Sequence, residues 1–227
     1  MSIERALNAF RAGNFVLVHD SSNRENEVDM VIPATAVKPH HVATMRQDAG
    51  GLICVAMHSR IADSFGLPYL TDIYREASHR FKILEATRPN DIPYDEHSAF
   101  SITVNHRRTF TGVTDIDRAL TISELGKLGA RAMNNPLVEE FGKEFRSPGH
   151  VPILRAANGL LTERRGHTEL VVTMAELAGI TPVVAICEML DARTNRALSR
   201  EKAMEYGKKH GIEFLEGSEI VSIQGGS

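Results

Sequence analysis

Short apolar runs alternate with polar stretches along this chain, and their lengths suit single strands and single helical faces. Apolar runs bounded by polar or turn-forming residues predict buried strands at residues 15–18, 30–33, 52–57, 101–104, 151–154, 182–187 and 214–215. Apolar positions that recur every three or four residues predict helices at residues 2–12, 39–48, 121–132, 168–178 and 199–210. Thr121, with Glu124 three residues later, is the expected N-cap of the third of these helices, and Ser199 that of the last.

The stretch 71–98 departs from this pattern, because it is dense in charge and runs into Pro89-Asn90-Asp91-Ile92-Pro93. We expect a helix there, followed by a long irregular loop. Strands and helices do not alternate strictly, and no phosphate-binding glycine motif, repeat, linker or low-complexity tract occurs. The pattern predicts a single α+β domain over residues 1–227, with helices packed on a mixed sheet.

Composition narrows the classes of function. The 227 residues carry a net charge of −3, include no Trp and are 6% aromatic, which disfavours nucleic-acid partners. No apolar stretch reaches the roughly 18 residues of a membrane span, and the N-terminus lacks the apolar core of a signal peptide, so we expect a cytoplasmic protein without a membrane partner. Cys54 and Cys187 lie in apolar runs, which predicts buried thiols rather than a disulfide or a zinc site.

An acidic loop lies between the first two predicted strands, with Asp20, Glu25, Glu27 and Asp29 in it and Arg24 among them. Alternate residues of an extended segment point the same way, so Glu25, Glu27 and Asp29 can converge. Converging carboxylates are what Mg²⁺ or Mn²⁺ requires, since hard cations select oxygen ligands. The alternative is a solvated acidic loop without a ligand.

A second polar cluster, Arg164-Arg165-Gly166-His167-Thr168-Glu169, comes just before an apolar helical run. Free N–H groups at a helix start bind anions, and a guanidinium adds bidentate phosphate recognition. Thr168 could add a hydroxyl, and His167 could reach a metal ion. The alternative is a charged turn with Thr168 as a helix cap.

Three further elements are weaker candidates. Residues 146–150 are expected to form a turn that contains His150, and residues 109–118 a turn followed by a helix cap. Glu188 closes a strongly apolar predicted strand. A carboxylate at the end of a buried strand is either paired or shifted in pKa, so Glu188 is either a salt-bridged strand end or a general acid or base.

These clusters occur together, in the same order, in one known family. The segments that carry the resemblance are 24–30, 48–54, 111–118, 147–151, 164–169 and 187–188. On these motifs the chain, over roughly residues 3 to 217, resembles 3,4-dihydroxy-2-butanone 4-phosphate synthase, and in the length of segment 71–98 its archaeal branch. The family commonly has glycine where this chain has Val28, so the acidic loop is expected to differ there in local shape.

The resemblance implies a reaction and its cofactors. The family converts D-ribulose 5-phosphate into L-3,4-dihydroxy-2-butanone 4-phosphate and formate, with two Mg²⁺ or Mn²⁺ ions at each active site. It has an α+β fold and forms a homodimer with its sites at the subunit interface.

The resemblance also implies roles for individual residues. The expected metal ligands are Glu25 and His167, and Glu27 is a weaker candidate. The expected substrate-binding residues are Arg24, Glu25, Asp29, Arg164, Arg165, Gly166, His167, Thr168 and Glu188. Glu188 is the leading acid or base, His150 an auxiliary catalytic group, and Cys54 a residue that lines the site without acting as a nucleophile.

Three other functions would use some of the same features. A metal-dependent aldolase or isomerase of sugar phosphates would share the carboxylates, the histidine and the arginines. A non-catalytic nucleotide-binding protein is disfavoured by the composition. An inactive paralogue is disfavoured by the presence of Glu25, His167 and Glu188, with Val28 the one residue in its favour.

Overall fold

Seven strands form one mixed sheet in the computed structural model, which describes residues 3–89, 91, 95, 98–133 and 135–224. Their order across the sheet is β4-β5-β3-β6-β2-β1-β9. The strands are β1 (Val16–His19), β2 (Val28–Pro33), β3 (Cys54–Met57), β4 (Phe100–His106), β5 (Phe145–Arg155), β6 (Val183–Glu188) and β9 (Glu213–Glu216). A separate ladder joins β7 (Leu190–Asp191) to β8 (Arg196–Ala197). The predicted mixed sheet is confirmed, since β1 pairs parallel to β9 and β3 to β5, while the other pairs are antiparallel.

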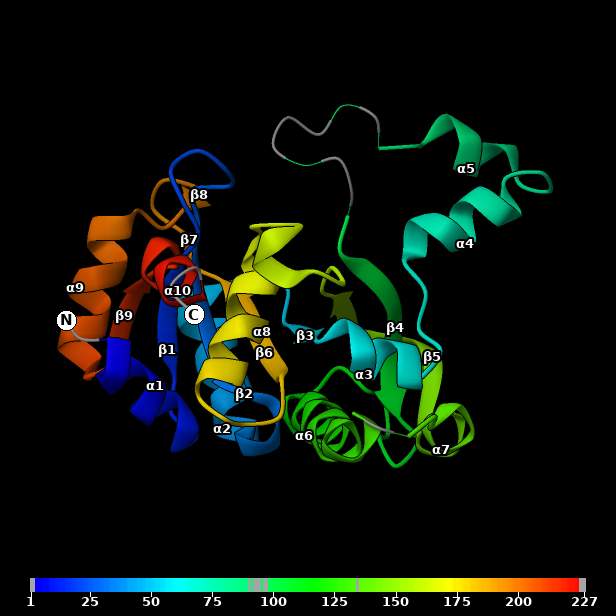
Figure 1. The fold of residues 1–227 in the computed structure, drawn as a ribbon, viewed down its shortest axis with the longest axis horizontal. Coiled ribbons are helices and arrows are strands. Elements are labelled where there is room, and N and C mark those ends of the chain that lie inside the picture. The colour runs from blue at the N-terminus through cyan, green and yellow to red at the C-terminus, as the bar shows by residue number, and fades with distance from the viewer. Residues whose placement is uncertain (1–2, 90, 92–94, 96–97, 134, 225–227) are drawn as a thin grey trace.

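Helices cover both faces of the sheet (Figure 1). One face packs against α1 (Ile3–Arg11), α8 (His167–Leu177) and α10 (Gly217–Gln224). The other packs against α2 (Pro39–Thr44), α3 (Ser59–Ser64), α6 (Asp115–Ala132), α7 (Val138–Glu144) and α9 (Arg200–His210). Successive strand residues point to opposite faces, so Leu17 joins one core while Val16 and Val18 join the other. This burial on both faces explains why the strands are apolar without alternation.

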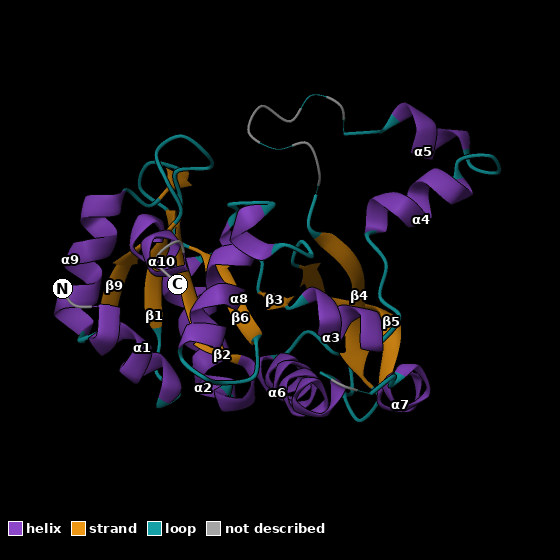
Figure 2. Ribbon diagram, viewed as in Figure 1, coloured by secondary structure: helices purple, strands orange, loops and turns teal. Residues whose placement is uncertain are grey.

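An arm of two helices, α4 (Leu70–Ala77) and α5 (Lys82–Ala86), projects from the sheet (Figure 2). Neither helix buries any residue in the described part of the chain. The prediction of one helix and then a loop over residues 71–98 was therefore only partly correct. Part of the predicted loop (residues 90, 92–94, 96 and 97) lies outside the described residues.

One prediction of local structure was wrong, and another was only partly correct. The helix expected to start at Thr121 begins at Asp115, and its N-cap is Thr114, whose hydroxyl accepts the Asp117 N–H. Thr121 is buried inside the helix, where its hydroxyl donates to the Asp117 carbonyl oxygen. Residues 146–150, expected to be a turn, lie within β5, but residues 147–150 form an irregularity between Arg146, which pairs with Asn105, and Val151, which pairs with Val104.

Other predictions hold with adjusted boundaries. Ser199 caps α9 as expected, accepting the Lys202 N–H. The helix expected over residues 39–48 is α-helical only to Thr44 and continues as a π-helical turn over Met45–Ala49. Short 3₁₀ turns occur at Ala34–Ala36 and Leu160–Thr162. Within the described residues, no helix combines the length and apolarity needed to cross a membrane.

Candidate functional site

The acidic loop joins β1 to β2 at one edge of the sheet (Figure 1). Asp20 organises this loop, because its two carboxylate oxygens accept the backbone N–H groups of Glu25 and Glu27, each at 3.0 Å. The chain turns at Asn26, whose φ of 54° lies in the left-handed region. Val28 lies beyond the turn in β2, where it is 1% exposed and pairs with His19. Valine at this position is therefore compatible with the loop, because the left-handed residue is Asn26.

The early carboxylate and the late imidazole meet, with Glu25 Oε2 2.7 Å from His167 Nδ1. Burial lowers the pKa of His167, but its hydrogen bond to Glu25 and the charges of Asp29, Glu25 and Glu188 outweigh this effect and raise the pKa to about 9. Burial raises the pKa of Glu25, but the hydrogen bond and charge of His167 reverse this and lower it. Without a metal ion, the two side chains therefore form an imidazolium–carboxylate pair, and a metal ion that bound His167 would displace a ring proton.

Three more carboxylates surround this pair. Asp29 and Glu188 are direct neighbours on β2 and β6, where like charges oppose each other. Asp29 is 1% exposed, its Oδ1 has no hydrogen-bond partner among the described residues, and burial raises its pKa well above the ordinary value. Burial and the charge of Glu25 raise the pKa of Glu27 as well. Four carboxylates around one imidazolium leave an excess of negative charge, which fits a divalent cation.

Two arginines beside this cluster share one carboxylate. Arg24 Nη2 lies 2.7 Å from Asp95 Oδ2, and Arg164 contacts the same oxygen through Nε at 2.7 Å and Nη2 at 2.6 Å. The third nitrogen of Arg164, Nη1, lies 2.6 Å from the fully buried Glu169. Arg164 is thus fixed on both sides, and a larger oxyanion that bound it would have to replace Asp95.

Glycine is required at the start of α8 for this arrangement. Gly166 is the residue immediately before the helix. A Cβ atom at this position would lie 2.4 Å from Arg164 Nη1 and 3.0 Å from Glu169 Oε2. The side chain of Arg164 therefore occupies the space that a side chain at position 166 would need.

Two adjoining cavities connect these groups. The smaller, of about 440 Å³, is lined by the carboxylates of Glu25, Glu27 and Glu188, together with His167 and Cys54. The larger, of about 1080 Å³, lies beneath the α4–α5 arm. Its basic lining residues are Arg24, Arg75, Arg88, Arg155, Arg164 and Arg165. Arg164 and Asp95 line both cavities, so a molecule with an acidic end could span from the carboxylates to the arginines.

Cys54 lines the smaller cavity, as expected from the sequence. Burial, followed by the charge of Glu188, raises the pKa of its thiol well above the ordinary value. The thiolate is the nucleophilic form of cysteine. The side chain is therefore a neutral part of the wall.

Four expected site residues are absent from the described lining of both cavities: Asp29, His150, Gly166 and Thr168. His150 is on β5, where its backbone N–H donates to Asn105 Oδ1 at 2.8 Å and its Nδ1 lies 3.1 Å from Asn105 Nδ2. Among the described residues, neither His150 nor Thr168 lines either cavity. Thr168 is 0% exposed, so only its backbone N–H remains available at the helix start. Arg165 lines the larger cavity but not the smaller one.

Sequence reasoning missed three residues of the site. Asp20 was recognised as acidic, but its bonds to two backbone N–H groups were not foreseen. Glu169 was part of a motif, but its contact with Arg164 depends on complete burial, which no pattern in the sequence indicates. Asp95 lies far from both arginines in the chain, so no local pattern could indicate its contacts.

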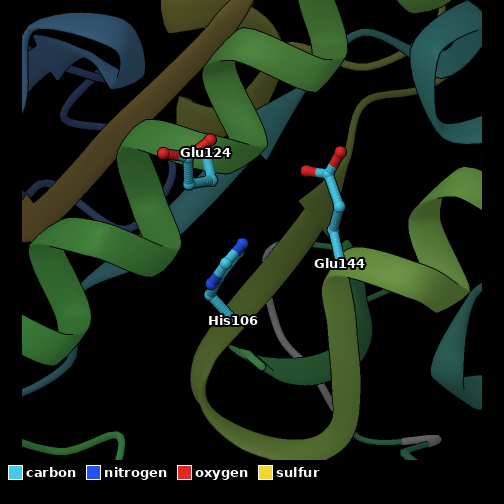
Figure 3. A group of neighbouring side chains, drawn as sticks. All are labelled: His106, Glu124 and Glu144. Carbon is cyan, nitrogen blue, oxygen red and sulfur yellow. The ribbon is translucent and has the colours of Figure 1, made fainter. Parts of the chain in front are cut away.

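A separate group of His106, Glu124 and Glu144 has potential ligand atoms within 4.8 Å of one another (Figure 3). His106 Nδ1 accepts the Arg108 N–H at 3.2 Å, which leaves the proton of a neutral ring on Nε2 and removes the lone pair that a metal ion would need there. Glu124 already pairs with Arg108 at 3.1 Å and Lys127 at 3.0 Å. This group is suited to ion pairs within the protein rather than to a metal ion.

The sequence and fold have close relatives. The family model for 3,4-dihydroxy-2-butanone 4-phosphate synthase matches residues 4–223. The chain is 53% identical over 222 residues to the 3,4-dihydroxy-2-butanone 4-phosphate synthase of Archaeoglobus fulgidus, covering 97% of this chain and 93% of that protein. It is 52% identical over 219 residues to the synthase of Methanothermobacter thermautotrophicus, covering 96% of this chain and 94% of that protein. A crystal structure of 3,4-dihydroxy-2-butanone 4-phosphate synthase in complex with two magnesium ions is 28% identical, with a TM-score of 0.77 and coverage of 98% of this chain and 95% of that one.

Proposed function

Because this chain belongs to the 3,4-dihydroxy-2-butanone 4-phosphate synthase family, we propose that it converts D-ribulose 5-phosphate into L-3,4-dihydroxy-2-butanone 4-phosphate and formate, as a carbon–carbon lyase of riboflavin biosynthesis. The observation that carries this proposal is the contact of Glu25 with His167, beside a cavity that ends at Arg164. This cavity offers a place for oxygen-rich cation chemistry at one end and for a phosphate at the other.

Glu25 and His167 are the proposed ligands of Mg²⁺ or Mn²⁺, two ions per site, with Glu27 as a further candidate. The excess of carboxylates and the unpartnered Asp29 Oδ1 among the described residues support this assignment. When bound, such ions stabilise negative charge that develops on substrate oxygens. Asp29 is proposed to accept a hydrogen bond from a substrate hydroxyl.

The phosphate is proposed to lie between Arg164 and Arg24, near the N-terminus of α8. Arg164 offers a guanidinium of fixed orientation, and the helix start offers backbone N–H groups at Gly166 and Thr168. Arg165, on the wall of the larger cavity, adds positive charge nearby.

Glu188 is the proposed general base and acid. Its carboxylate removes the proton next to the substrate carbonyl, giving an enediol, and water then leaves from C1. The carbon skeleton rearranges, and C4 is released as formate when water adds back, so the atoms of substrate and products balance. General acids and bases typically contribute about 10²–10⁴-fold in rate, so Glu188→Gln should lose activity by that factor and keep its stability.

Within one chain His150 is held by Asn105 and lines neither described cavity, so we propose that it joins this chemistry from a second copy of the chain. We therefore propose a homodimer with its sites at the interface. The surface next to Asn105 supports this arrangement. Gly112 packs against the Asn105 side chain, and the adjoining Phe110 and Ile116 are 94% and 69% exposed. Exposed apolar side chains gathered in one place are typical of an association surface.

The reaction is tested by incubating the purified protein with ribulose 5-phosphate and Mg²⁺ and measuring formate with formate dehydrogenase. We expect formate with Mg²⁺ and none after chelation with EDTA, with recovery on adding Mn²⁺. Isomerised pentose phosphate without formate would indicate an isomerase, and two smaller fragments without formate an aldolase. Either result would contradict the proposal.

The shared site is tested by mixing inactive His150→Ala and Glu188→Gln variants. Random exchange of subunits should give hybrid dimers with one intact site each, which restores about a quarter of the wild-type activity. No recovery after verified subunit exchange would contradict a site built from two chains.

A further inference from the structure

The turn of the acidic loop has a second anchor, separate from Asp20. Asn26 lies between Glu25 and Glu27 and takes up a left-handed backbone, which asparagine tolerates better than most residues. The conformation at this residue sets the directions in which the two neighbouring glutamates leave the backbone. Whatever holds Asn26 therefore also sets the positions of those carboxylates.

His19 holds Asn26. The two residues are joined by a 3.1 Å contact between His19 Nε2 and Asn26 Oδ1, and His19 is 5% exposed at the end of β1. A protonated ring would donate to Oδ1, and a neutral ring would accept from the amide nitrogen after a flip of the amide. Both arrangements place a hydrogen bond between the same two side chains.

The other side of the His19 ring is tied to the sheet. Its Nδ1 lies 2.8 Å from Glu216 Oε2, and since a carboxylate only accepts, Nδ1 is the donor. Glu216 faces His19 because β1 and β9 pair in parallel register. The second oxygen of Glu216 accepts from Arg200 Nε at 2.6 Å. His19 therefore has little rotational freedom and acts as a fixed point for the loop.

We propose that His19 is a positioning residue, which fixes the loop turn through Asn26 and thereby sets the affinity of Glu25 and Glu27 for a divalent cation. This inference rests on the proposed function, because it assumes that these carboxylates bind the ion. Groups that orient metal ligands typically account for about 10–100-fold in metal affinity. His19 acts through the backbone of the loop rather than on a ligand directly, so an effect near tenfold is expected.

The test is the dissociation constant of Mn²⁺, measured on the full-length protein by electron paramagnetic resonance of the free ion. We expect His19→Ala to weaken Mn²⁺ binding about tenfold. Asn26→Gly should have the same effect, because glycine keeps the left-handed backbone but loses the amide. The double variant should be no weaker than either single one, since both changes remove one interaction.

A matched control is His58→Ala. His58 is also a buried histidine, 7% exposed, directly after the end of β3. Its Nδ1 accepts a hydrogen bond from the Arg60 N–H, and its Nε2 lies 3.3 Å from Glu176 Oε1. This change should cost stability and leave the Mn²⁺ affinity unchanged. If His19→Ala does not fold, Asn26→Gly, in an exposed turn, decides the question.

Two results would overturn the inference and can be told apart. Unchanged Mn²⁺ affinity in folded His19→Ala and Asn26→Gly, with binding abolished by Glu25→Gln, would overturn the role of His19 alone. Mn²⁺ binding that is absent in the wild type or insensitive to Glu25→Gln would overturn the role of His19 together with the proposed metal ligands.

Discussion

Replacing Glu169 with glutamine should weaken the hold on the substrate phosphate without touching any group that takes part in proton transfer. Glu169 is in the first turn of α8 and is 0% exposed. Its Oε1 accepts the Ala157 N–H at 2.9 Å, and its Oε2 accepts from Arg164 Nη1 at 2.6 Å. Glutamine has the same shape and can still accept from Ala157. Its amide NH₂ then faces Arg164, so that one donor meets another.

The size of the effect follows from what Arg164 keeps. A hydrogen bond between charged groups typically contributes about 1.5–3 kcal/mol, whereas leaving a buried charge without a partner costs about 3–5 kcal/mol. Arg164 retains its two contacts with Asp95, so the larger penalty does not apply. We expect the free energy of unfolding to fall by about 2 kcal/mol. A loosened guanidinium should also raise KM about tenfold, equivalent to about 1.4 kcal/mol, with a smaller change in kcat.

Urea unfolding and formate production at saturating Mg²⁺ measure the two effects. Glu163→Gln is the matched control, because Glu163 lines the same larger cavity but accepts the Gly159 N–H rather than a bond from Arg164. It should change KM little. If Glu169→Gln lost stability but kept the wild-type KM, Arg164 would not be the phosphate-binding group.

Two other substitutions test separate parts of the structure. Asp95→Asn removes the carboxylate shared by Arg24 and Arg164. Inorganic phosphate should then inhibit formate production at about tenfold lower concentration, because it no longer competes with the Asp95 carboxylate for the two arginines. Weaker inhibition by phosphate in this variant would contradict such competition. Asp117→Asn should lower the free energy of unfolding by about 1 kcal/mol at pH 7, because the carboxylate accepts backbone N–H groups from Gly112 and neighbouring residues. These hydrogen bonds, of which the one from Gly112 has the largest effect, hold the pKa of Asp117 below its ordinary value of 3.8. The stabilisation is therefore present above pH 3.8 and is lost as the pH falls through the lowered pKa. A difference from wild type in urea unfolding that stayed constant from pH 7 to about pH 2 would refute this assignment.

The sequence was most informative where one physical requirement dominated. The strands around residues 16–18, 30–33 and 183–187 are buried on both faces, so an apolar run was a sufficient signal. The contact of Glu25 with His167 was anticipated from the resemblance. The fold explains it, since the β1–β2 loop and the start of α8 lie at the same edge of the sheet.

The failures have physical causes as well. Residues 146–150 contain proline and glycine among polar side chains, which is typical of a turn. They lie within the bounds of β5, but the register with β4 shifts across residues 147–150, because Arg146 pairs with Asn105 and Val151 with the preceding Val104. Thr121 satisfied the spacing of a capping residue, although Thr114 precedes a first turn that contains Asp115 and Asp117, a stronger signal for a helix start. The shared contact of Asp95 with two arginines is purely tertiary, so no local pattern could have predicted it.

If Glu25 and His167 bind the same cation, the anomalous scattering of Mn²⁺-soaked crystals will locate the metal ion between them. We predict an anomalous peak between the Glu25 carboxylate and the His167 ring, and no such peak in crystals of Glu25→Gln. Peaks found only elsewhere, for example beside His106, Glu124 and Glu144 (Figure 3), would contradict it.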